Sequence, residues 1–231
     1  MTLQVLRSRP ARAAGIRARL IAALIIAPVT VAIAAGCSSG PGAPSPAATT
    51  TAAATATRQV HVAPVGPDGA AAAAFRVTRS AASATCEPGS EAIGQAYRCF
   101  AGNEVYDPCW AERTSRPTVL CVGEPWAATG TQLSVTGTLG ALPAAGSGAA
   151  PPWGVELAGG QRCVLLQGAH GEFDGLVIDY YCTPRLSLLR GLIKAGPLWR
   201  ARSVVVQSGR SSSGPVEVIT TAWFGTPGTL R

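Results

Sequence analysis

The chain has 231 residues and a formal net charge of +7, with 47% hydrophobic and 13% charged residues. Five of its 19 basic residues and none of its 12 acidic residues precede Cys37, so the chain after that cysteine carries a charge of only +2. No basic run in that part suits a phosphate backbone, and we therefore expect no nucleic-acid partner.

The N-terminus has the pattern of a cleavable export signal. An apolar segment, Leu20–Ala35, follows a group of arginines and ends at the small residues before Cys37; the arginines are Arg7, Arg9, Arg12, Arg17 and Arg19. This order predicts a signal peptide over residues 1–36. A retained membrane helix is disfavoured, because the segment has 16 residues and contains Pro28, whereas a spanning helix needs about 20 apolar residues.

The cysteine at the cleavage point indicates a particular class of export signal, that of lipoproteins. Ala34-Ala35-Gly36-Cys37 resembles the lipobox of bacterial lipoproteins, so we expect Cys37 to carry the acyl chains that hold the mature protein on the outer face of the cytoplasmic membrane. The alternative is an ordinary secreted protein with a spare cysteine. The sequence thus predicts a location in the cell envelope, with the membrane as first partner.

A linker and one folded domain are expected after Cys37. Residues 37–74 are rich in Ala, Thr, Pro, Ser and Gly, a composition that buries too little apolar surface to order itself. Within this segment, the run that starts at Arg58 has the alternation of an edge strand. We expect a single domain over residues 75–226 and a short tail over residues 227–231.

The six cysteines after Cys37 predict a disulfide framework. Their number is even, the segment is expected to be exported, and no Cys-x-x-Cys or histidine cluster indicates zinc. Cys163 and Cys182 are expected to face each other from neighbouring strands. The other pairs are assigned as Cys86–Cys99 and Cys109–Cys121, from among the 15 pairings that six cysteines allow.

The domain is expected to be mainly β: a small antiparallel sheet, sandwich or partial barrel, held by its disulfides, with one or two short helices. A hairpin is predicted at Trp153–Leu166, where alternating residues flank a Gly-Gly turn. Further strands are predicted at Leu133–Leu139, Leu176–Cys182, Leu198–Gln207 and Val216–Phe224. Gly209–Gly214 has the composition of a turn. The helices are expected at Glu91–Tyr97 and Pro184–Ala195.

One histidine and two carboxylates lie close together in a predicted loop. His170, Glu172 and Asp174 suit a catalytic base with an orienting acid, or a divalent cation loop. A polar hairpin tip is the simpler interpretation. The calcium version lacks the spaced ligands of an EF-hand, and no Gly-x-Ser-x-Gly motif is present. No metal or other cofactor is expected.

Three aromatic residues near the first cysteines are candidates for a ligand groove. Tyr106, Trp110 and Trp126 have side chains that stack on sugars or peptides. A packing role in the core is favoured, because a small domain needs its few large side chains inside.

Several of these motifs together resemble uncharacterised exported proteins and lipoproteins of actinobacteria. The resemblance covers residues 86–224 and rests on Tyr97–Phe100, Asn103 with Asp107–Trp110, Val119–Cys121, Pro125-Trp126, Pro152–Leu157, Gly160–Cys163 and Tyr181-Cys182. It implies export and disulfides, and it implies no activity, cofactor or catalytic residue.

The function that fits these features best is a lipid-anchored binding or structural module of the cell envelope, without enzymatic activity. Its partner is expected to be a cell-wall polysaccharide or a membrane protein. The first alternative is a hydrolase that acts on the cell wall through His170, Glu172 and Asp174. The second is a stress or signalling accessory protein that masks or senses a partner.

Overall fold

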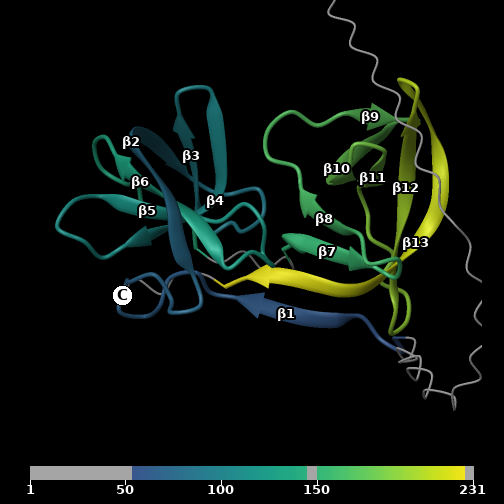
Figure 1. Cartoon of the computed structure of the whole chain (residues 1–231), viewed down its shortest axis with the longest axis horizontal. Helices are drawn as coiled ribbons and strands as arrows, with labels where there is room; N and C mark the ends of the chain where they lie inside the picture. The colour runs from purple at the N-terminus through teal and green to yellow at the C-terminus, as the bar shows by residue number, and fades with distance from the viewer. Residues whose placement is uncertain (1–53, 145–149, 227–231) are drawn as a thin grey trace, which may run out of the picture. The chain divides into compact units, whose positions relative to one another are not determined.

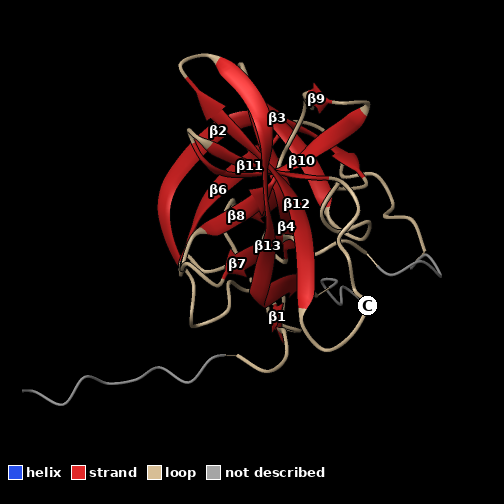
Figure 2. Cartoon of the chain, turned by 90° about the vertical axis from the view of Figure 1, so that its right-hand side faces the viewer, coloured by secondary structure: helices blue, strands red, loops and turns tan. Residues whose placement is uncertain are grey.

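The structure is a computed structural model that describes residues 54–144 and 150–226. Within these two ranges all regular structure is β-strand and no helix is present (Figures 1 and 2). The mainly-β prediction is therefore confirmed. The predicted signal peptide, Cys37, the linker up to residue 53 and the tail lie outside the described residues. A search of the described part for a helix long and apolar enough to cross a membrane finds none.

Five consecutive strands form a closed sheet that we call the first barrel: β2 (Arg76–Pro88), β3 (Tyr97–Ala101), β4 (Glu104–Glu112), β5 (Thr118–Cys121) and β6 (Thr129–Val135). Each strand pairs antiparallel with the next, and β6 pairs parallel with β2 to close the ring. The parallel pair follows from the strand number, because the first and fifth strands of an up-and-down meander run in the same direction.

Disulfides occupy much of the interior of the first barrel. Cys86 lies directly opposite Cys99 across β2 and β3, and Cys109 lies directly opposite Cys121 across β4 and β5. Both pairs are bonded, with Cα atoms 4.0 Å apart. The rest of the buried interior comes from small or medium side chains and one tyrosine: Ala84, Tyr97, Val119 and Leu133. The two pairings are those predicted from the sequence.

Six further strands close into a second barrel: β7 (Gly154–Leu157), β8 (Arg162–Leu165), β10 (Leu176–Thr183), β11 (Leu186–Leu189), β12 (Trp199–Gln207) and β13 (Arg210–Gly225). The pairing of β13 with β7 closes this sheet, and the short β9 (Glu172–Phe173) pairs with β10. Cys163 on β8 is bonded to Cys182 on β10, as predicted.

Local sequence explains the hairpins of the second barrel. β7 and β8 pair across the predicted Gly-Gly turn, which confirms that hairpin. β12 and β13 are joined by Ser208 and Gly209, whose φ angles are 53° and 75°. Two central residues with positive φ match the right-handed twist of the flanking strands. β13 begins directly after this turn, so the prediction that Gly209–Gly214 is a turn was correct only at its first residue.

A shared core joins the two barrels. Trp110 on β4 packs against Trp153, with ring centroids 5.5 Å apart. Both tryptophans belong to one buried cluster with residues from β5, β7, β10 and β13. Gly225, at the end of β13, lies so close to the side chain of Ile93 that a Cβ atom would overlap it. The loop after β2 and the last strand are therefore fitted to each other.

Both predicted helices were wrong. Pro184–Ala195 contains β11, and Glu91–Tyr97 is an irregular loop with turns that leads into β3. β11 lies between β10 and β12 and satisfies the backbone groups of both neighbours. A helix at this place would leave both strands with open edges, so the pairing demand of the sheet outweighs the helical spacing of the leucines.

The second half of the predicted linker also contributes a strand to the sheet. β1 (Arg58–Val62) pairs parallel with the end of β13, from Arg58 opposite Thr221 to Val62 opposite Gly225. The edge-strand prediction is confirmed, and the prediction that disorder continues to residue 74 was wrong. Thr57 fixes the start of β1, because its buried hydroxyl donates to the Ile219 carbonyl at 2.6 Å.

Candidate functional site

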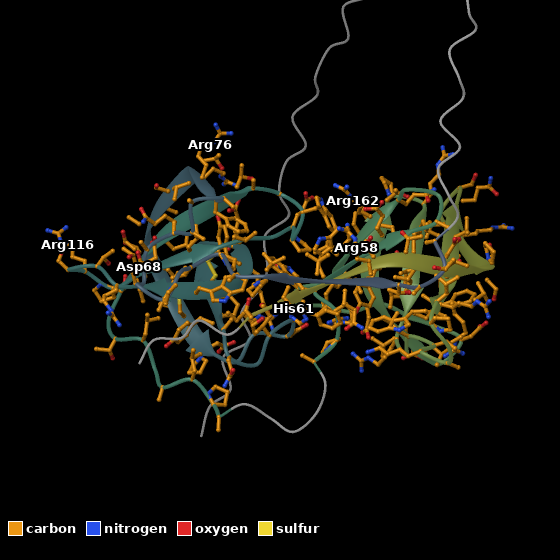
Figure 3. The ribbon with its side chains drawn as sticks, turned by 90° about the horizontal axis from the view of Figure 1, so that it is seen from below. Arg58, His61, Asp68, Arg76, Arg116 and Arg162 are labelled. Carbon is orange, nitrogen blue, oxygen red and sulfur yellow. A yellow bond between two sulfur atoms is a disulfide. The ribbon has the colours of Figure 1, made fainter. Side chains whose placement is uncertain are left out.

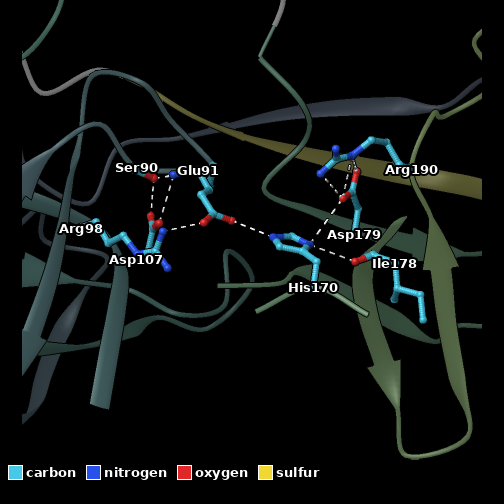
Figure 4. Close-up of polar contacts among 9 residues, drawn as sticks. Ser90, Glu91, Arg98, Asp107, His170, Ile178, Asp179 and Arg190 are labelled. Atoms are coloured by element: carbon cyan, nitrogen blue, oxygen red, sulfur yellow. Dashed lines mark hydrogen bonds and ion pairs between the residues drawn. The ribbon is translucent and has the colours of Figure 1, made fainter. Parts of the chain in front are cut away.

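The most highly connected ionisable side chain of the candidate site is His170, in the loop between β8 and β9. Its Nε2 lies 2.9 Å from a carboxylate oxygen of Glu91, which precedes β3 in the first barrel. Its Nδ1 lies 2.9 Å from the backbone carbonyl of Ile178 and 3.5 Å from Asp179, both on β10 (Figure 4). The imidazole therefore bridges a loop of one barrel and a strand of the other.

The partners of His170 determine its protonation. A carbonyl and a carboxylate only accept hydrogen bonds, so both ring nitrogens must donate, and an imidazole that donates from both nitrogens is protonated. The hydrogen bond to Glu91 is the largest cause that raises the pKa of His170, followed by the Ile178 carbonyl and the charges of Glu91 and Asp179. Partial burial opposes this rise. The arrangement therefore favours the protonated imidazole.

Each carboxylate next to His170 also contacts an arginine. Arg98 on β3 donates to Glu91 at 2.5 Å. Arg190, after β11, donates from Nε to both oxygens of Asp179 at 3.1 and 3.0 Å, and its Nη2 lies 3.0 Å from the same carboxylate. The Asp179 carboxylate raises the pKa of Arg190. The result is a row of alternating charges, with the positive imidazole at its centre (Figure 4).

A second polar cluster holds the loop that carries Glu91. Asp107 accepts hydrogen bonds from the Ser90 hydroxyl and from the Glu91 amide, and Ser90 in turn accepts from the amides of Ala92 and Ile93. Asp107 is 2% exposed, and this burial is the main cause of its raised pKa. The buried carboxyl therefore positions Glu91 toward His170 (Figure 4).

These charged side chains line a cavity of about 680 Å³. The polar wall consists of Glu91, His170, Asp179, Arg190 and Lys194, and the apolar wall includes Pro151, Pro152, Leu165 and Leu192. A volume of this size, with an apolar wall and a few converging polar groups, is typical of a small-ligand site.

The predicted cluster of His170, Glu172 and Asp174 does not form. Glu172 lies on β9, and Asp174 occupies the tight turn between β9 and β10 with a φ of 51°. Within the described chain, the carboxylates that contact His170 are Glu91 and Asp179. Glu172 and Asp174, two and four residues after His170, belong to the β9–β10 hairpin. Asp179, farther along on β10, lies next to the imidazole instead.

The three aromatic residues predicted to line one groove lie in different places. Trp110 is buried and its Nε1 donates to the Thr226 carbonyl, which confirms the core interpretation. Tyr106 donates to Glu104 on the same strand. Trp126 packs edge-on against Trp223 at 5.2 Å and lines a separate cavity of about 320 Å³. The groove prediction was therefore wrong as a single site.

Cysteine sulfurs do not provide a metal site in the described structure. Cys99, Cys109 and Cys121 bring their sulfur atoms within 4.8 Å of one another. Each of these sulfurs is bonded in a disulfide, so none can offer the thiolate that a metal requires.

The residues that reasoning from sequence missed are Glu91, Asp179 and Arg190. Glu91 is 79 positions away from His170 in the chain, and no local spacing relates the two. Comparisons with known proteins find no match to this chain among family models, curated proteins or solved structures. Its function is therefore inferred from the residues of this site.

Proposed function

We propose that this protein is a lipid-anchored binding module on the outer face of the bacterial cytoplasmic membrane, with its ligand site in the cavity beside His170. The anchor is the acylated Cys37 expected from the lipobox-like sequence. The ligand classes that fit the location are a cell-wall polysaccharide and an exposed segment of a membrane protein.

One observation favours binding over hydrolysis. Both nitrogens of His170 lie 2.9 Å from oxygen acceptors, an arrangement that favours the protonated imidazole, and a protonated imidazole has no free lone pair to act as a general base. The neighbouring carboxylates are engaged by arginines as well. A preformed cavity in which Glu91, His170, Asp179 and Arg190 already pair with one another is suited to recognition by shape and polarity. The ion pairs of His170 in the described residues are with Glu91 and Asp179 and include neither Glu172 nor Asp174, which supports the binding proposal over the hydrolase alternative.

Mass spectrometry of the mature N-terminus tests the anchor. We expect a chain that begins at Cys37 and carries acyl groups, and we expect Cys37→Ser to abolish the lipid mass and detergent-phase partitioning. Cys182→Ala, which removes a cysteine of the folded domain, serves as the control and should keep the lipid. A mature N-terminus without acyl groups would refute the anchor.

Co-sedimentation with purified cell wall tests the cavity. Leu192 lines the cavity, so Leu192→Trp should fill it and lower the fraction bound by at least tenfold. Val77→Trp is the control, because Val77 is already 37% exposed on the first barrel. Release of soluble wall fragments that is lost in His170→Gln would instead establish the hydrolase. Binding that is insensitive to Leu192→Trp would remove the cavity as the wall site.

A further inference from the structure

The outer face of β12 carries basic and apolar side chains next to one another. Arg200 and Arg202 are two positions apart and both exposed, so they share a face of the strand. Arg202 lies opposite Val216 on β13, and Ile193 forms a bridge with Arg200 from the other side. Directly opposed residues share a face. We call Ile193, Arg200, Arg202 and Val216 the β12 patch.

The β12 patch combines unusual exposure with unpaired charge. Val216 is 54% exposed and Ile193 is 40% exposed, which places both among the few large apolar side chains that the described surface leaves open. None of the ion pairs in the described residues includes Arg200 or Arg202. The nearest carboxylate along β13 is Glu217, which lies opposite buried Ala201 and so points to the other face.

The chain that leads back to Cys37 enters the fold next to this patch. Thr57 donates its amide to the Pro197 carbonyl at 2.9 Å, and its hydroxyl accepts the amide of Trp199 at 2.8 Å. Thr57 is thus hydrogen-bonded to Trp199, which directly precedes Arg200 on β12. Sixteen residues separate Cys37 from the first described residue, and even fully extended they reach no more than about 55 Å.

We propose that the β12 patch rests on the anionic lipid surface of the membrane that holds the acyl chains. This inference builds on the proposed anchor, which keeps the start of β1 close to the bilayer. Arginines attract anionic headgroups, and exposed apolar side chains enter the interface between headgroup and acyl chain. A lipid and a basic patch together give firmer membrane attachment than either alone, and they fix which side of the domain faces outward.

Vesicle co-sedimentation tests the patch without the acyl chains. The protein is the mature chain from residue 37 with Cys37→Ser, and the probes are vesicles of phosphatidylcholine alone or mixed with phosphatidylglycerol. We expect binding to the mixed vesicles that weakens as salt rises. Arg200→Gln with Arg202→Gln should weaken this binding about 30-fold. Each positive charge near an anionic surface contributes roughly fivefold to the affinity, and the variant removes two such charges.

A matched control removes two arginines elsewhere. Arg76 and Arg116 project from the first barrel into solvent (Figure 3), and Arg76→Gln with Arg116→Gln changes the net charge equally. This control should bind as the parent does. Val216→Ser should weaken binding more moderately, because it removes only apolar contact.

Three results would overturn the proposal: no binding to mixed vesicles, equal binding to both vesicle types, or an equal loss in the control variant. Capture by native membranes that protease treatment abolishes would assign the patch to a membrane protein instead. The lipid anchor is tested separately, by the mass of the mature N-terminus. Failure of the anchor and failure of the β12 patch therefore give different results.

Discussion

The two barrels are stabilised in different ways. The interior of the first barrel contains seven buried hydrophobic residues, and three of them are half-cystines. The second barrel and the shared junction are filled by large side chains such as Trp153, Tyr180, Leu188 and Ile219. A small ring of five strands encloses too little apolar volume to be stable by burial alone, and covalent cross-links compensate for this.

Strand composition shows the same contrast. β2 has 13 residues, of which only Ala84 is fully buried. β13, the longest strand, buries a continuous group near its C-terminal end, from Thr221 to Trp223, and this group pairs with β7 on one side and β1 on the other. The comparison teaches that disulfides should matter most where the strands contribute the least apolar area.

Removing the disulfide at the centre of the first barrel should have the largest effect. Cys109→Ala with Cys121→Ala deletes a cross-link that closes 12 residues. Such a loop contributes about 3 kcal/mol to the free energy of unfolding, and the missing sulfurs leave a further packing defect. We expect amide hydrogen exchange to accelerate in β3–β6 well before it does in β10–β13.

The matching change in the second barrel is Cys163→Ala with Cys182→Ala. It removes a loop of similar length, 19 residues, from a core that is otherwise aliphatic and aromatic. We expect a loss of about 3 kcal/mol from the cross-link, without selective opening of one barrel. Equal and uniform exchange in both variants would contradict the distinction between the barrels.

The junction where the two kinds of core meet is the next place to test. Gly225→Ala places a methyl group onto the side chain of Ile93, and overpacking of this kind costs about 1–3 kcal/mol. Combining it with Ile93→Ala should lose less stability than the two single changes added together, measured by urea denaturation.

Gly94 is the control for the junction, since a Cβ atom there meets open space in the same loop. Gly94→Ala should leave the midpoint of unfolding nearly unchanged. If Gly225→Ala behaves like Gly94→Ala, the barrels are not fitted together at this point.

The bridge at His170 should give the smallest effect, on the order of 1 kcal/mol as for other partly exposed ion pairs. Its folded-state pKa is raised, chiefly by the hydrogen bond to Glu91. The stability from this bridge is therefore fully present below the unfolded-state pKa and is lost as pH rises through the folded-state pKa. Thermal unfolding of the wild type across neutral pH should follow this trend, and His170→Gln should flatten it.

His61 provides the control for this titration, because it is the only other histidine in the chain and stacks on Phe224. His61→Gln should keep the pH trend of the wild type, and Glu91→Gln should weaken it. A trend that survives His170→Gln would assign the pH dependence to another group.

Alternation along the chain was a good guide to the fold. It located the hairpin of β7 and β8, strands β10, β12 and the core of β13, and the edge strand β1. The same alternation supported the disulfide Cys163–Cys182, and the other two predicted pairs are also found, each between residues directly opposite across neighbouring strands. The prediction from local spacing failed at β11. Its leucines have helical spacing, but they form a strand because β10 and β12 both need a pairing partner.

The sequence by itself determined the strand-rich class, because strand alternation is a local pattern. The same alternation supported the pair Cys163–Cys182, whereas Cys86–Cys99 and Cys109–Cys121 were chosen among the 15 possible pairings and are decided by the strand register of the structure. Only the tertiary structure decided the site. Glu91 meets His170 across 79 positions, and Trp110, for which a core role was favoured, packs against Trp153 in a core that both barrels share. These contacts depend on how the two closed sheets pack against each other. No repeating pattern in the sequence records which residues far apart in the chain become buried together in such packing.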